Sequence, residues 1–123
     1  MKILLVDDSR TMRNIQKKTL ESLGGELSEA GDGVEALAVI ATSQGFDLMV
    51  VDWNMPNMDG ITLVTKVREA DKRPPIIMCT TEAEKQRVID AVKAGVNNYI
   101  VKPFTPEAIL EKVRQTLAKS KAA

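Results

Sequence analysis

Four short apolar runs recur along the chain at intervals typical of buried strands. Each run is too short for a helix and apolar at successive positions, which predicts a strand covered on both faces of a parallel sheet. The runs lie at 3–6, 48–51, 76–79 and 99–101. A fifth segment, 26–30, alternates polar and apolar residues and predicts an edge strand with one face in water.

Between these runs, apolar residues recur every three or four positions, as on one face of a helix. We expect Gly24 and Gly25 to end the first helix and Gly95 to end the fourth, whereas Thr105 and Pro106 should cap and begin the fifth. The predicted apolar stripes are Met12, Ile15 and Leu23; Val34, Leu37, Ala38 and Ala41; Ile61, Val64 and Val67; Val88, Ala91 and Val92; and Ile109, Leu110, Val113 and Leu117.

Five strands alternating with five helices predict an α/β protein, because each parallel crossover places a helix over one face of the sheet. Five strands in a chain of 123 residues favour the flavodoxin-like, doubly wound fold with strand order 2-1-3-4-5. With 44% hydrophobic residues, the chain is expected to form one domain over residues 1–123.

Charge and residue types narrow the class of function. The 17 Lys and Arg residues balance the 17 Asp and Glu residues, which disfavours nucleic acid as the main partner. The absence of histidine excludes His-based triads, histidine metal sites and phosphohistidine carriers in this chain. Cys79 lies in an apolar run and should be a core residue. No signal peptide or membrane-spanning stretch is visible, so we expect a soluble cytoplasmic monomer.

Polar side chains follow the four apolar strands at the points where they end. Asp7 and Asp8 follow the first strand, Asp52 the third, Thr80 the fourth and Lys102 the fifth. In an open α/β sheet, ligands bind outside the carboxyl ends of the strands, where the strand order switches. The sequence therefore predicts that three carboxylates, a hydroxyl and an ammonium group converge at one edge of the sheet.

Helix capping is the alternative explanation for such residues. Asp8, Ser9 and Asp59 could each cap the helix that follows. Capping does not explain three carboxylates brought together from two strands, because their mutual repulsion would destabilise an empty site. A bound cation removes that objection, and oxygen ligands without His or Cys favour a hard ion such as Mg²⁺.

This set of groups suits phosphoryl transfer. An aspartate beside a divalent cation can attack phosphorus and form an aspartyl phosphate. Thr80 can donate a hydroxyl hydrogen bond and Lys102 supplies a fixed positive charge, the arrangement that stabilises a transferring phosphoryl group. Exposed charges on the first helix, Arg10, Arg13, Lys17 and Lys18, are interpreted as solvated residues rather than a docking site for a kinase.

The motifs around these residues resemble the receiver domains of two-component signalling, and most closely the stand-alone receivers of chemotaxis. The similarity covers nearly the whole chain. It is carried by VDDS at 6–9, VDWNMP at 51–56, MDG at 58–60, CTTE at 79–82 and YIVKPF at 99–104.

The resemblance implies that Asp52 is the phosphoacceptor and that a sensor histidine kinase is the donor. It also implies Mg²⁺ as the cofactor. Asp8, Asp52 and the backbone carbonyl of Asn54 would hold the ion. Asp7 would hold it through a water molecule.

A switch mechanism is implied in the same way. Thr80 and Lys102 would contact the phosphoryl oxygens, and the bond from Lys102 to Pro103 would be cis and turn Lys102 into the site. Thr80 would move toward the phosphoryl group and Tyr99 would turn inward behind it. The fourth helix, fifth strand and fifth helix would then present a changed surface to a partner.

The partner implied by the resemblance is a flagellar motor switch protein, with a chemotaxis kinase as donor. The alternative is a phosphorelay, in which the phosphoryl group passes to a histidine phosphotransfer protein. Self-catalysed phosphorylation and dephosphorylation would be the only chemistry, so the chain is not expected to be an enzyme. Asn54 and Glu82 would tune hydrolysis to seconds or minutes, and Thr81, bulkier than the residue often found there, could alter donor access.

Three other functions fit the sequence less well. A haloacid-dehalogenase-like phosphatase needs a second Asp two residues after its nucleophile, and Asn54 cannot serve there as a general acid. A flavodoxin would place a flavin phosphate on the first loop, where Asp7 and Asp8 would repel it. An unphosphorylated interaction module with the same fold is disfavoured because no site residue is missing.

Overall fold

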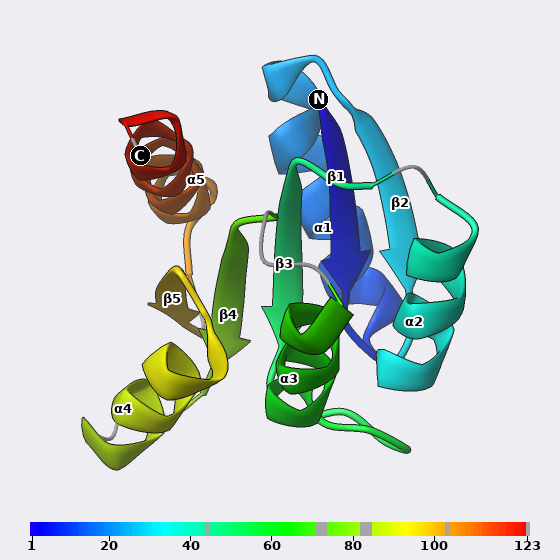
Figure 1. The fold of residues 1–123 in the computed structure, drawn as a ribbon. Coiled ribbons are helices and arrows are strands. Elements are labelled where there is room, and N and C mark those ends of the chain that lie inside the picture. Colours follow the sequence, from blue (N-terminus) through cyan, green and yellow to red (C-terminus); the bar gives the residue numbers. More distant parts are fainter. Residues whose placement is uncertain (44, 71–73, 82–84, 103, 123) are drawn as a thin grey trace.

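A central parallel sheet organises the fold, with helices on both faces (Figure 1). The computed structural model describes residues 1–43, 45–70, 74–81, 85–102 and 104–122. Within these residues the sheet has five strands in the order β2-β1-β3-β4-β5, as predicted. They are β1 (Lys2–Val6), β2 (Glu26–Ala30), β3 (Leu48–Asp52), β4 (Ile76–Thr80) and β5 (Asn98–Val101).

The helices divide between the two faces of the sheet (Figure 1). One face is covered by α2 (Gly33–Ala41), α3 (Gly60–Ala70) and α4 (Lys85–Ala94), and the other by α1 (Arg10–Leu20) and α5 (Pro106–Ala122). A 3-10 turn at Glu21–Leu23 extends α1. Gly24 then ends it with φ of 71°, a left-handed conformation that glycine adopts without a Cβ penalty.

Successive strand residues point into two separate cores, because side chains alternate across a strand. Leu4 and Val6 of β1 pack with the α2–α3–α4 layer, whereas Ile3 and Leu5 pack with α1 and α5. Cys79 is fully buried in the second core, as predicted. Burial raises the pKa of its thiol to about 12, so the thiol stays protonated and serves as a core side chain.

Side-chain caps define where the helices begin. Ser9 Oγ accepts a hydrogen bond from the Met12 amide at 3.2 Å, and Asp59 Oδ1 accepts one from the Thr62 amide at 2.9 Å. Thr105 Oγ1 accepts from the Ala108 amide at 3.1 Å, so the predicted cap of α5 is also confirmed. Ser9 rather than Asp8 is the N-cap of α1, which leaves the Asp8 carboxylate available to the acidic cluster described below.

The predicted stripes of α3 and α5 pack against the cores, whereas some residues predicted to face the core on the other helices are exposed. Ile15 on α1 is exposed, while Gln16 and Leu20 face the core. On α2 the residues Val34, Ala38 and Ala41 are exposed, and on α4 Val92 is exposed. Short helices with apolar residues on more than one side can bury either stripe, and the strand connections decide which one faces the sheet.

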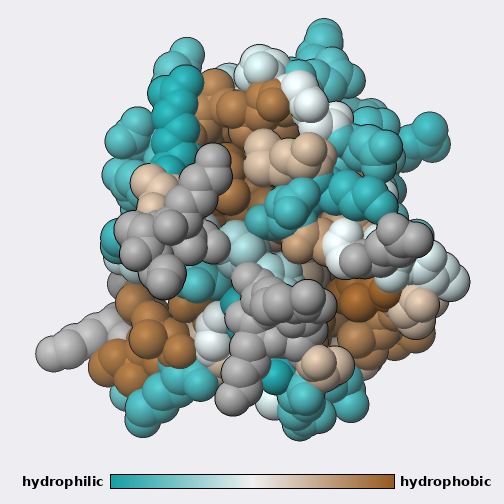
Figure 2. Space-filling model, turned by 45° about the horizontal axis from the view of Figure 1, so that its top comes forward, coloured by the Kyte–Doolittle hydropathy of each residue, from teal (hydrophilic) through white to brown (hydrophobic). Residues whose placement is uncertain are grey.

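The predicted burial of the last strand needs a similar correction. The segment 99–101 was expected to be covered on both faces, but β5 is an edge strand and Val101 is exposed. None of the helices in the described segments combines the length and apolar character needed to cross a membrane. In the view of Figure 2 the surface is mostly hydrophilic, with separate hydrophobic patches.

Candidate functional site

The polar residues predicted at the carboxyl ends of the strands lie together around the end of β4. Asp52 and Thr80 are the last residues of β3 and β4, and Lys102 directly follows β5. The Trp53 amide donates to the Cys79 carbonyl at 2.9 Å, and the Lys102 amide donates to the Thr80 carbonyl at 2.7 Å. These backbone bonds place Asp52 and Lys102 on the two sides of β4.

Lys102 bridges two buried carboxylates. Its Nζ lies 3.0 Å from Asp7 Oδ2 and 3.1 Å from Asp52 Oδ1. Asp7 is 1% exposed and Asp52 is 7% exposed, and the Lys102 side chain is 14% exposed. Burial favours loss of the Lys102 charge, but the two carboxylates outweigh it and raise its pKa. The lysine therefore stays protonated in the site.

Three carboxylates meet at this point. Asp7, Asp8 and Asp52 each offer an oxygen, and these oxygens all lie within 4.8 Å of one another. Burial, followed by repulsion from Asp7, raises the pKa of Asp52, and attraction to Lys102 only partly offsets this. Three carboxylates against one ammonium group leave an excess of negative charge, which favours binding of a cation.

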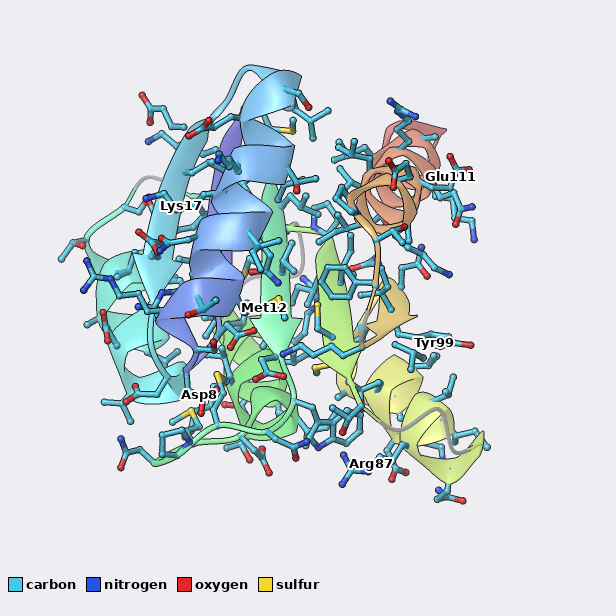
Figure 3. All side chains as sticks on the ribbon, turned by 180° about the vertical axis from the view of Figure 1, so that it is seen from behind. Asp8, Met12, Lys17, Arg87, Tyr99 and Glu111 are labelled. Atoms are coloured by element: carbon cyan, nitrogen blue, oxygen red, sulfur yellow. The ribbon has the colours of Figure 1, made fainter. Side chains whose placement is uncertain are left out.

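The donor atoms fit a hard divalent cation such as Mg²⁺. Asp8 is exposed and opens the cluster to solvent, as seen at the carboxyl end of the sheet in Figure 3. Asp7 is already engaged: Oδ1 accepts from the Ser9 amide at 2.9 Å and Oδ2 accepts from Lys102. Asp52 pairs with Lys102 through Oδ1, so Asp8 and the second oxygen of Asp52 would be the direct ligands of such an ion, and Asp7 would suit a metal-bound water.

The other predicted site residues lie in the segments after β3 and β4 or outside the described residues. Asn54 is exposed in the loop between β3 and α3, two residues after Asp52. Thr81 is exposed directly after β4. Glu82 and Pro103, and with Pro103 the predicted cis bond, lie outside the described residues.

Thr80 and Tyr99 line one small hollow beside α4, together with Trp53 and Arg87. The Arg87 guanidinium carbon lies 4.7 Å from the centre of the Trp53 ring, a cation–π contact. Tyr99 points outward from β5 (Figure 3), and Lys112 Nζ lies 5.4 Å from its ring centre. The two residues predicted to act together are thus neighbours, with Tyr99 in its outward position.

Arg13 is a site residue that the sequence interpretation missed. Its Nη1 donates to the backbone carbonyl of Asp7, and its Nε lies 3.1 Å from Glu29 Oε1. Lys17 Nζ lies 3.1 Å from the other Glu29 oxygen. Arg13 and Lys17 are therefore not free solvated charges. One feature of the sequence could have indicated this network: Glu29 is an acidic residue on the predicted edge strand, and Arg13 and Lys17 are basic residues on the first helix.

Mg²⁺ binding should weaken as pH falls. Asp52 has a raised pKa, so it takes up a proton at a higher pH than an ordinary carboxyl group, and that proton competes with the ion. The metal-free protein should respond in the opposite sense. Because Asp52 binds its proton more readily in the native state than in the unfolded chain, the contribution of this group to stability should rise as pH falls. Mg²⁺ titrations and urea unfolding between about pH 4, near the ordinary carboxyl pKa, and pH 8 would measure both trends. An affinity that stays constant over this range would contradict the prediction.

Comparison with known proteins gives extensive similarity. The family model for the response regulator receiver domain matches residues 3–114. A chemotaxis protein CheY homolog from Campylobacter jejuni is 52% identical over 120 residues, covering 95% of this chain and 92% of the relative. Chemotaxis protein CheY1 from Helicobacter pylori is 53% identical over 120 residues, covering 95% and 97%. The crystallised chemotaxis protein CheY4 of Vibrio cholerae matches with a TM-score of 0.88 at 38% identity, covering 94% of this chain and 97% of that one.

Proposed function

The chain belongs to the response regulator receiver domain family, and from this premise we propose that it is a phosphorylation-activated signalling switch with Asp52 as the phosphoacceptor. The observation that carries the proposal is the pairing of Lys102 with two buried carboxylates inside a group of three. Such a pocket combines a nucleophile, a cation site and a fixed positive charge in one place.

The chain's own residues would act on the phosphoryl group as follows. An Asp52 carboxylate oxygen attacks phosphorus, and the bond from phosphorus to the donor breaks with its electron pair leaving on the donor. Lys102, 3.1 Å from that carboxylate, favours its ionised form and then pairs with a phosphoryl oxygen. Thr80, at the end of the neighbouring strand, would donate its hydroxyl to another oxygen.

Mg²⁺ held by Asp8, Asp52, the Asn54 backbone carbonyl and, through water, Asp7 would neutralise charge on the phosphoryl oxygens. Hydrolysis would follow when water attacks phosphorus, restoring the carboxylate and releasing inorganic phosphate. The protein would catalyse only these two reactions on itself. We therefore propose a signalling protein rather than an enzyme with a separate substrate, acting in the cytoplasm beside its sensor histidine kinase.

The output would run through α4, β5 and α5. A Thr80 hydroxyl drawn toward the phosphoryl group vacates part of the hollow that it shares with Tyr99, so the tyrosine can turn inward. That movement takes the Tyr99 ring away from Lys112 on α5 and changes the surface between α4 and α5. One new charged group would thus shift a two-state equilibrium.

The change at the metal site and the phosphoacceptor can be followed through Trp53, which is the only tryptophan and directly follows Asp52. Mg²⁺ should change its fluorescence saturably, and acetyl phosphate should then produce a further change. Asp52→Asn should lose the second response, whereas Asp90→Asn, at an exposed position on α4, should keep both. If the Trp53 fluorescence of the folded protein changed with neither Mg²⁺ nor acetyl phosphate, the result would contradict the proposal and favour an unphosphorylated interaction module.

We propose a flagellar motor switch protein as the partner of the phosphorylated form, supported by the chemotaxis names of the similar proteins. Phosphorylated protein should bind a motor-switch peptide more tightly than unphosphorylated protein, in a fluorescence titration. It should not pass its phosphoryl group to a histidine phosphotransfer domain. Rapid transfer without peptide binding would instead assign the protein to a phosphorelay.

A further inference from the structure

The loop that joins β3 to α3, residues 53–59, is tied to the start of α2. Asn57 Nδ2 donates to Asp32 Oδ2 at 2.9 Å. Asp32 is also the N-cap of α2, because its Oδ1 accepts from the Glu35 amide at 2.8 Å. One carboxylate thus serves two purposes: it begins a helix and it anchors the loop that carries Asn54.

The backbone at Asn57 indicates that this contact is specific. Among the described residues, Asn57 is the one non-glycine with a left-handed φ, at 66°. Asparagine tolerates this conformation better than most residues, but it still costs free energy relative to extended backbone. The hydrogen bond to Asp32 helps to offset that cost.

A second contact presses the same loop against α2. A Cβ added to Gly33 would lie 2.8 Å from the Met58 side chain, so the two elements are in close contact there. At its base the loop is closed by the Gly60 amide, which donates to the Trp53 carbonyl at 2.8 Å. The loop is therefore held at its base by its own backbone and at its tip by the first turn of α2.

The path of this loop determines where the Asn54 backbone points. Two residues of chain reach at most about 7 Å, so Asn54 stays near Asp52 whatever the loop does. Connectivity alone does not orient its carbonyl, because backbone dihedrals in an untethered loop can vary. The tether at Asn57 restricts them.

We propose that Asn57 is a positioning residue for the divalent cation: by bonding to Asp32 it holds the loop in the shape that presents the Asn54 carbonyl to the acidic group. This inference rests on the proposed function, because it assumes that the acidic group binds Mg²⁺. Asp32 supports it electrostatically. The Glu35 amide and then Asn57 lower the pKa of Asp32, so its carboxylate remains an ionised acceptor.

Four variants separate positioning from general stability. Asn57→Gly removes the side-chain bond but accepts the left-handed backbone, whereas Asn57→Ala removes the bond and strains the backbone. Asp32→Ser keeps a capping hydroxyl but loses the oxygen that Asn57 contacts. Asp32→Asn is the conservative rescue, because Asn57 can turn its amide and accept from the new side chain.

The measurement is titration with Mg²⁺ alone, followed by Trp53 fluorescence, with urea unfolding of each metal-free variant in parallel. Asn57→Gly and Asp32→Ser should each raise the Mg²⁺ dissociation constant about tenfold. The double variant should be no weaker than either single one, because both remove the same contact. Asn57→Ala should bind like Asn57→Gly but unfold at lower urea, and Asp32→Asn should bind close to wild type.

Unchanged Mg²⁺ affinity in Asn57→Gly, or additive losses in the double variant, would overturn the inference while leaving the metal site intact. Losses that follow the unfolding midpoint across the four variants would also overturn it, because they would assign Asn57 a purely structural role. Failure of the wild-type protein to bind Mg²⁺ at all would overturn the proposed function, and this inference with it.

Discussion

Lys102→Met should destabilise the metal-free protein at neutral pH by about 3–5 kcal/mol, the typical cost of removing one partner from a buried ion pair. The methionine has similar length but no charge, so Asp7 and Asp52 would lose the ammonium that lies 3.0 and 3.1 Å from them. Urea unfolding in EDTA would measure the loss. Mg²⁺ should restore much of it, because a dication can compensate the same carboxylates, and the variant should bind Mg²⁺ more tightly than wild type.

Acid should also rescue this variant. Without Lys102, burial and repulsion from Asp7 are no longer offset, so the pKa of Asp52 should rise further and stability should increase as pH falls through it. Lys18→Met is the matched control, because Lys18 is exposed on α1 and its loss should change stability by no more than about 0.5 kcal/mol. A Lys102→Met protein as stable as this control, or one indifferent to Mg²⁺, would show that Lys102 does not neutralise the acidic group.

Most of the fold could be predicted because strands covered on both faces carry unbroken apolar runs. Residues 48–51 are apolar and Asp52 follows them, so both the strand and its functional end are visible in the sequence. The boundaries are less visible. Lys2 belongs to β1 because it pairs with Glu26 of β2, and side-chain pattern does not record backbone pairing. The buried face of α1 was not predicted correctly because a polar residue, Gln16, takes a core position there.

The site was predictable to the extent that strand ends determine it. Asp7, Asp52 and Lys102 converge because parallel strands end at one edge of the sheet. Contacts between exposed polar residues on different elements have no periodic signal. The bond from Asn57 to Asp32 spans 25 residues, and Arg13 reaches the backbone carbonyl of Asp7 as well as the Glu29 carboxylate. Such contacts follow from the packed structure and become visible only there.

Gly60→Ala should be strongly destabilising although it places a better helix former at the first residue of α3. An added Cβ would lie 2.4 Å from the Asp52 carbonyl oxygen and 3.0 Å from the Trp53 Cα. These are backbone atoms, which cannot rotate away, so the end of β3 must shift. Overpacking of this kind costs about 1–3 kcal/mol, which exceeds the gain of up to about 1 kcal/mol in helix propensity.

The shift should reach the chemistry as well, because the displaced carbonyl belongs to the phosphoacceptor itself. We therefore expect Gly60→Ala to lower both the urea midpoint and the rate of phosphorylation by acetyl phosphate, measured through Trp53. Gly31→Ala is the control, since its Cβ would meet the Glu35 carboxylate at 3.3 Å, the end of a flexible side chain that can move. Equal effects of the two substitutions would mean that the close approach of α3 to β3 does not set the position of Asp52.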